Sequence, residues 1–219
     1  MTLDPLKLSM LGTAAAQSFY MVSVSALLTA ILGIPLGVLL VIFRPGHILA
    51  NRPAQTVLGL AVNALRSIPF PIFIVFIIPL TRFLVGTSLG PKGVIVPLTL
   101  AATVFMARLT ETSLLEVPKG VIEAALSCGA SRWRIIWRVM LPEAKSGLIL
   151  AITIMVITLI SYSAMAGAVG GGGLGDLAIR YGYQRYQTDV MFLTVFALLI
   201  IVQLTQNLGD YLAKRCSRR

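Results

Sequence analysis

Five long apolar stretches constrain the fold of this chain more than any other feature of its sequence. A helix needs about 20 mostly apolar residues to cross a bilayer, and each stretch is close to that length or longer. Only 12% of the 219 residues are charged and 57% are hydrophobic, whereas a soluble domain carries about 25% charge. We therefore predict an all-α integral membrane protein, one domain over residues 1–219, whose five transmembrane helices cover residues 19–43, 56–85, 94–115, 147–165 and 190–212.

The distribution of lysine and arginine predicts the orientation of these helices. If the N-terminus lies outside, the cytoplasmic segments hold eleven of the 18 basic residues and the outer segments hold five, with two inside predicted spans. Basic residues concentrate in cytoplasmic loops, so this arrangement is favoured and the C-terminus is predicted to be cytoplasmic. The same rule accounts for the net charge of +10, and we expect membrane lipids rather than nucleic acid around the chain.

Motifs that carry chemistry are scarce. The sequence has no GxxxxGK[ST] motif, so we predict that this chain does not hydrolyse ATP itself and is not an enzyme. His47 is the only histidine, and we expect neither a metal site nor a bound cofactor. Residues 170–175, GGGGLG, formally match the dinucleotide-binding pattern, but a predicted span rather than a strand precedes them. We interpret them as a flexible outer loop that lets helices pack closely.

The longest segment outside the predicted spans, residues 118–144, has its own helix signals. Residues 121–128 suit a short helix that Gly129 can end in the left-handed conformation. Ser131 is a suitable cap for a second helix, and Pro142 prevents a further regular turn in front of it. The segment therefore predicts two short amphipathic helices that lie across the cytoplasmic surface of the membrane.

Three interpretations of this segment are open from its residues alone. Ala125, Gly129 and Ile135 fit the spacing of a DNA-binding helix-turn-helix, but the spans on either side obstruct entry into a major groove. A membrane-surface helix pair anchored by Trp133 and Trp137 explains the tryptophans but not the glutamate, paired alanines and glycine around them. The third interpretation is a docking surface for a peripheral partner.

Seven residues of the segment stand in one register: Glu123, Ala124, Ala125, Gly129, Val139, Leu141 and Pro142. This pattern resembles the EAA motif in the permease subunits of bacterial ABC importers. Val139 stands where isoleucine is commoner, which keeps the apolar character of the position. The resemblance implies that residues 118–144 are a coupling helix, which docks in a cleft of an ATP-hydrolysing subunit and passes the motion of that subunit to the spans.

The resemblance extends over most of the chain, and four further stretches are similar to the methionine-importer permease, a compact five-span member: RPG at 44–46, RSIPF at 66–70, VPLT at 96–99 and YSAMAGAVGGGGLG at 162–175. It implies the type I ABC importer permease fold in a bacterial inner membrane, working as a homodimer. It also implies two ATP-binding cassette subunits that use ATP and Mg, and a periplasmic or lipid-anchored substrate-binding protein. The cargo implied is methionine, in L- and D-forms, with close analogues.

Five residues are candidates for the translocation path or its gate: Ser161, Ser163, Met165, Asn63 and Arg66. Our hypothesis is that Met165 from each copy of a homodimer meets near the axis and closes the path, while the serines line it. Ordinary helix packing explains the small residues around Met165 equally well. Asn63 and Arg66 face either the path or the membrane surface.

Two other functional classes are alternatives. One is an ABC permease for another small solute, and the second is a stand-alone secondary transporter. The latter needs coupling-ion groups buried in the spans. Glu111 is the only acidic residue deep in a predicted span, and Arg108 stands three residues before it. We expect these two side chains to form an i, i+3 ion pair, which counts against a proton- or sodium-coupled transporter.

Overall fold

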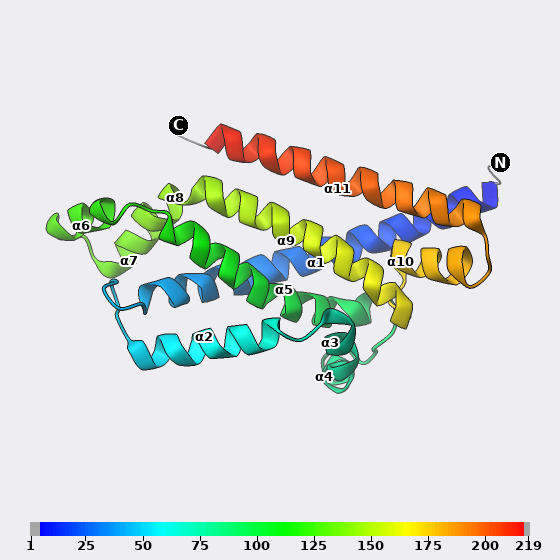
Figure 1. Cartoon of the computed structure of the whole chain (residues 1–219), viewed down its shortest axis with the longest axis horizontal. Coiled ribbons are helices and arrows are strands. Elements are labelled where there is room, and N and C mark those ends of the chain that lie inside the picture. Colours follow the sequence, from blue (N-terminus) through cyan, green and yellow to red (C-terminus); the bar gives the residue numbers. More distant parts are fainter. Residues whose placement is uncertain (1–4, 217–219) are drawn as a thin grey trace.

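The computed structural model describes residues 5–216, and every regular element within that range is a helix. Four of the helices are long and apolar enough to cross a membrane. They run roughly along the long axis of the molecule (Figure 1): α1 (Pro5–Ile42), α5 (Gly90–Leu115), α9 (Lys145–Ala166) and α11 (Thr188–Cys216). The prediction of an all-helical fold is confirmed.

The long helices begin earlier than the apolar stretches that predicted them. α1 already includes Pro5 rather than beginning near residue 19, and it continues through the internal Pro35. α5 has Pro91 in its first turn. α11 continues to Cys216, past the last apolar residue, with Lys214 and Arg215 in its final turn. Apolar character therefore marks the membrane-crossing part of each helix and not its ends.

The second apolar stretch, residues 56–85, differs from the single helix expected there. It is divided into α2 (Arg52–Arg66), α3 (Phe70–Phe76) and α4 (Ile78–Val85), and α2 and α3 are bent by 100°. Ser67 closes α2, because its N–H and its hydroxyl both donate to the Asn63 carbonyl, at 3.1 and 2.9 Å. Pro69 then cannot continue the helix, since it has no N–H.

α2 and α3 add a fifth candidate span only if the two helices form one broken crossing. Proline residues break a membrane helix where neighbouring groups satisfy the carbonyls that they leave unpaired. The number of spans and the orientation of the termini remain predictions.

α1 and α5 pack against each other along a large part of their lengths. Two glycines of α1, one turn apart, face α5. A Cβ atom on Gly33 would lie 2.7 Å from Met106 Cβ, and one on Gly37 would lie 2.5 Å from Thr110 Cβ. Small residues at this spacing let membrane helices approach closely. The contact between α1 and α5 therefore depends on the absence of side chains at these two positions.

Three short helices form the end of the bundle near the N-terminus (Figure 1): η2 (Gly167–Val169), α10 (Gly173–Leu177) and η3 (Ala178–Tyr183). The Gly173 N–H donates to Gln17 Oε1, and the next N–H donates to Ser18 Oγ, both at 2.9 Å. A Cβ atom on Gly175 would lie 2.2 Å from the carbonyl oxygen of Ala164. The glycine-rich loop thus permits close packing, as predicted, and hydrogen bonds tie it to α1.

The opposite end of the bundle carries residues 118–144, which we call the coupling segment (Figure 1). It is built from four short helices: α6 (Lys119–Ser127), α7 (Arg132–Ile135), η1 (Ile136–Met140) and α8 (Leu141–Glu143). It follows the end of α5 and leads directly into α9.

The close approach of α1 and α5 gives a first prediction. Gly37→Ala should lower the stability of the protein in detergent by about 1–3 kcal/mol, because the new methyl group has no room beside Thr110. Gly12→Ala, also in α1, is the control, since nothing lies within 4 Å of a Cβ atom there. Thermal unfolding of both variants measures the difference. Equal melting temperatures would contradict the packing argument.

Candidate functional site

The turn inside the coupling segment has the geometry that its sequence predicts. Gly129 adopts a φ of +73°, and its N–H donates to the Leu126 carbonyl at 2.9 Å. The next N–H, that of Ala130, reaches back to the Ala125 carbonyl at 3.1 Å. These two bonds form a Schellman motif, in which a left-handed residue ends a helix. The predicted ending at Gly129 is confirmed.

The second half of the segment begins at Ser131 as expected, but helical structure continues through Pro142 as α8. Ser131 caps α7, since its hydroxyl accepts from the Arg134 N–H at 3.4 Å. Before Pro142 the chain is a π-helix rather than an α-helix, and the Leu141 N–H donates to the Ile136 carbonyl. Proline lacks the N–H that an α-helix needs and clashes with the carbonyl four residues earlier, so the turn in front of it widens.

The inner face of the coupling segment is apolar and packs on the ends of three long helices. Ile135 and Met140 are fully buried there. Ala125, Val139 and Leu141 of the EAA motif are half-buried against the same group. We call this group the anchor cluster; it contains Val38, Val41, Ile42, Leu114, Val117, Ile122, Ile135, Ile136, Met140, Ala144 and Leu148. Because α1, α5 and α9 all contribute to it, the segment is fixed to the bundle at several points.

The outer face of the segment is polar and aromatic. Glu123, Ala124 and Pro142 of the EAA motif are exposed. Trp133 and Trp137 are 69% and 55% exposed, with ring centroids 5.5 Å apart. The three arginines of the segment are exposed as well. Large exposed aromatic side chains beside arginine are typical of protein interfaces, so this face is suited to bind a partner.

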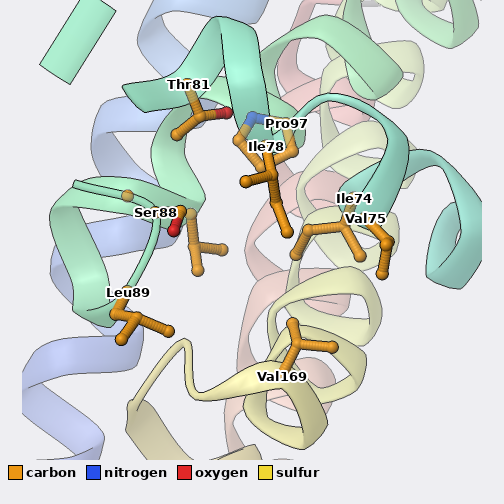
Figure 2. Close-up of a pocket in the computed structure, with 10 residues that line it drawn as sticks. Ile74, Val75, Ile78, Thr81, Ser88, Leu89, Pro97 and Val169 are labelled. Atoms are coloured by element: carbon orange, nitrogen blue, oxygen red, sulfur yellow. The ribbon is translucent and has the colours of Figure 1, made fainter. Parts of the chain in front are cut away.

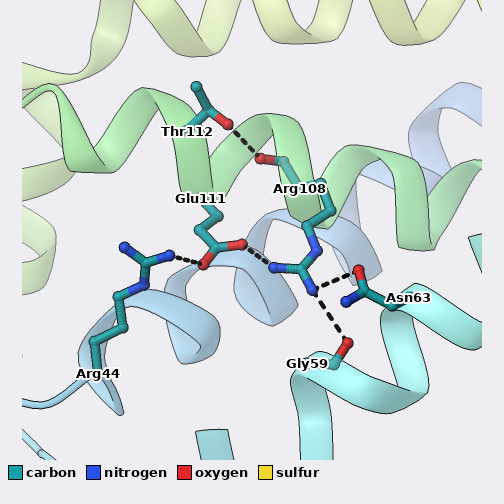
Figure 3. Close-up of polar contacts among 6 residues, drawn as sticks. All are labelled: Arg44, Gly59, Asn63, Arg108, Glu111 and Thr112. Atoms are coloured by element: carbon teal, nitrogen blue, oxygen red, sulfur yellow. Dashed lines mark hydrogen bonds and ion pairs between the residues drawn. The ribbon is translucent and has the colours of Figure 1, made fainter. Parts of the chain in front are cut away.

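A polar network joins the bundle to α2 beside the anchor cluster (Figure 3). Arg108 Nη1 donates to Glu111 Oε2 at 2.6 Å, which confirms the predicted ion pair. Arg108 Nη2 donates to Asn63 Oδ1 at 2.8 Å and to the Gly59 carbonyl at 3.1 Å. Asn63 and Gly59 belong to α2, so one guanidinium group connects α5 with α2.

Glu111 has a second cationic neighbour in this network. Its side chain is only 5% exposed, and Arg44 Nη2 lies 3.1 Å from Oε1. This contact is an ion pair rather than a directed hydrogen bond, since Oε1 has no hydrogen-bond partner within the described chain. Sequence analysis missed Arg44 and the contact between Arg108 and Asn63. No local pattern reports contacts between residues so far apart in the chain.

His47 lies in the loop between α1 and α2, outside the spanning helices. Burial lowers the pKa of His47, and the positive charges of Arg44 and Lys119 lower it further. His47 is therefore mainly neutral at pH 7 and adds little charge to this end of the bundle.

The path candidates fall into two separate groups. Ser161 and Met165 are exposed on α9, one turn apart, with Met165 49% exposed. Ser163 is buried, and its hydroxyl donates to the Ile160 carbonyl at 2.8 Å. Asn63 is bound to Arg108 on another helix, while Arg66 is exposed and forms no ion pair with any residue in 5–216. No hydrogen bond within that range joins the two groups.

Two cavities in the described chain lie within the bundle. Figure 2 shows the smaller one, about 40 Å³, which Thr81, Pro97 and Val169 line among others. The larger one, about 230 Å³, lies between α1, α9 and α11 and includes Ser163 in its mostly apolar wall. Neither offers a group of charged side chains that could hold a zwitterionic solute.

The apolar helices indicate a helical membrane protein, and the segment anchored at one end of the bundle has an exposed face that is suited to bind a partner. Residues 33–218 match the family described as binding-protein-dependent transport system inner membrane component. The chain belongs to this family.

Curated relatives cover most of the chain. A probable D-methionine transport system permease protein MetI of Vibrio cholerae is 49% identical over 210 residues, 96% of this chain and 93% of the relative. The methionine import system permease protein MetP of Bacillus subtilis is 44% identical over 181 residues, 83% of this chain and 82% of the relative.

Two solved structures are similar to the fold. An inward-facing structure of the MetNI methionine ABC transporter has a TM-score of 0.97 and 44% identity, covering 99% of this chain and 100% of that chain. An amino acid ABC transporter determined with histidines has a TM-score of 0.72 at 17% identity, covering 98% of this chain and 100% of that chain, and this likeness concerns the fold alone.

The Schellman turn gives a second prediction. Gly129→Ala should speed hydrogen exchange of the Gly129–Ala130 amides about tenfold, because alanine in the left-handed region costs roughly 1–2 kcal/mol. Gly120→Ala is the control, since it lies in α6 with open space around a Cβ atom. Gly129→Asn should restore protection, as asparagine tolerates this conformation. Exchange unchanged in Gly129→Ala would show that the turn does not depend on glycine.

Proposed function

We propose that this chain is the membrane-spanning permease subunit of an ATP-driven ABC importer that carries methionine across the cytoplasmic membrane. The observation that carries the proposal is the coupling segment. Its EAA residues divide between an anchored inner face and an exposed outer face on a chain of this family. The relatives named for methionine transport support the choice of cargo, in L- and D-forms with close analogues.

The proposed assembly sits in the bacterial inner membrane. Five spans, with α2 and α3 as one broken crossing, would place the N-terminus outside and the coupling segment in the cytoplasm. A second copy completes the path, and two ATP-binding cassette subunits dock on the two coupling segments. A periplasmic or lipid-anchored binding protein delivers cargo to the opposite face. ATP and Mg act in the cassette subunits, and no cofactor is proposed for this chain.

The geometry indicates how docking would move the spans. When the cassette subunits close on ATP, they displace the exposed face that carries Glu123 and Ala124. The inner face transmits this displacement to α1, α5 and α9 through the anchor cluster, because closely packed apolar groups move together. The spans then change between inward and outward access, and the driving force is the difference in affinity of the cassette subunits for the two states.

A stand-alone secondary transporter fits the site less well. Glu111 is the only carboxylate that is buried within residues 5–216, and it is paired with Arg108 and Arg44. A coupling-ion site needs a buried carboxylate that is available to the ion. Glu111 is instead neutralised on both sides, which supports an energy source outside this chain.

The proposal predicts ATP-dependent uptake that requires the coupling segment. Vesicles holding this chain, a cassette subunit and a binding protein should take up labelled methionine only with ATP. Ala124→Trp should reduce both cassette binding and uptake about tenfold or more, because a bulky indole replaces a small exposed residue at the docking face. Ala16→Trp, an exposed position on α1 at the other end of the bundle, is the control. Equal uptake without ATP would instead favour the secondary transporter.

Met165 gives a separate prediction about the gate. Met165→Ala should raise the ATP-independent leak of methionine about tenfold, equal to a loss of ~1.4 kcal/mol of closure, since the side chain that fills the path is shortened. Leu150→Ala, an exposed position nearer the other end of α9, is the control. The measurement is efflux from preloaded vesicles. A leak that stays at the wild-type level would contradict the hypothesis that Met165 closes the path.

A further inference from the structure

α2 is held only weakly by the apolar core. Val62 is its one buried residue, and it packs in a small cluster with Leu40, Val104 and Ala107. Leu58 of α2 is partly buried against the same cluster, and polar contacts add to this attachment. One guanidinium group, that of Arg108, donates to a carbonyl and a side-chain amide of α2. Hydrogen bonds of this kind exchange partners without opening a packed core, so α2 is suited to move relative to α5.

Glu111 fixes the position of that guanidinium group. Glu111 Oε2 accepts a hydrogen bond from Arg108 Nη1 at 2.6 Å, and Arg108 Nη2 is left to face α2 (Figure 3). A buried ion pair adds little net stability, because removing two charges from water offsets their attraction. It does, however, fix the direction of the planar guanidinium fork. The pair is better suited to position Arg108 than to stabilise the fold.

Two residues of this network are close in the chain to residues that hold the coupling segment. Arg44 follows Ile42 by two residues, and Glu111 precedes Leu114 by three. Ile42 and Leu114 are both members of the anchor cluster. A displacement of the coupling segment that shifts these apolar residues therefore also shifts the charged groups beside them.

The far end of α2 leads toward the proposed gate. Past the 100° bend, Phe70 of α3 stacks on Tyr162 of α9, with ring centroids 4.3 Å apart and planes within 1°. Tyr162 precedes Met165 by three residues on the same helix. A displacement of α2 can therefore reach the part of α9 that carries Met165 through α3 and the stacked rings of Phe70 and Tyr162.

We propose that Arg108 is a positioning residue that links the coupling segment to α2. Glu111, which also pairs with Arg44, holds its guanidinium group by an ion pair. Asn63 Oδ1 and the Gly59 carbonyl accept hydrogen bonds from the same group. Displacement of the coupling segment is passed to α2 through this link, and from α2 to the gate through the stacked rings. The inference rests on the proposed function. It adds the route inside the chain by which ATP-driven motion of the coupling segment reaches the gate.

The test compares methionine uptake per ATP hydrolysed in vesicles holding the complete importer. Arg108→Gln and Asn63→Leu should each lower this ratio about tenfold, the effect expected from losing a hydrogen bond to a charged group. Thr56→Leu is the matched control, because it also replaces an exposed polar residue of α2 two turns earlier on the same face. Asn63→Asp keeps an acceptor for Arg108 and should retain the ratio.

The double variant Asn63→Leu/Arg108→Gln separates the link from a direct role of Asn63 in the path. If both residues act through one contact, the double variant should be no worse than either single variant. Independent, additive losses would overturn the link. So would a fall in melting temperature with an unchanged uptake ratio, which indicates a structural role alone. Absence of ATP-driven uptake in the wild type would overturn the proposed function together with the link.

Discussion

The burial of the coupling segment against the ends of three long helices is the contact on which the rest of this structure depends. Ile135 and Met140 are fully buried in it, and burying an apolar side chain of that size contributes about 1.5–3 kcal/mol. A segment held only by its two flanking loops would move without moving the bundle. Because it is anchored, a force on its exposed face is applied to α1, α5 and α9 together.

The helices differ in how firmly they are joined, and this difference decides which parts can move. α1 and α5 meet through Gly33 and Gly37 at distances that leave no space for a Cβ atom. A contact that close cannot slide without a steric clash, so the two helices behave as one body. α2 buries only Val62, with Leu58 partly buried beside it, and hydrogen bonds from Arg108 add to this contact. The boundary between a rigid body and a movable helix therefore runs between α5 and α2.

Local chemistry could be predicted from the sequence wherever one residue decides the backbone. Gly129 ends its helix in the left-handed region and Ser131 caps the next one, and both depend on neighbours within five residues. The helical class followed from the length of the apolar stretches. The bend before Pro69 was harder to predict, because prolines are tolerated in membrane helices and whether one breaks the helix depends on surrounding groups.

Contacts between distant helices were beyond sequence analysis. The pair Arg108–Glu111 was predicted because its members stand three apart on one helix. Arg44 and Asn63 join that pair from 67 and 45 residues away, and their contact depends on the rotation of each helix about its axis. The hydrophobic pattern of α1 and α5 does not fix that rotation, since apolar residues surround both helices and face lipid as readily as protein.

The same uncertainty of rotation explains the outcome for the path candidates on α9. The hydroxyls of Ser161 and Ser163 both donate to carbonyls of their own helix, yet the second residue is buried while the first is exposed. Ser161 and Met165 share a face because four residues make about one turn. Within the described part of a single chain this face is exposed. It can form the wall of a path only when a second copy closes the other side. The proposed gate therefore requires the proposed homodimer.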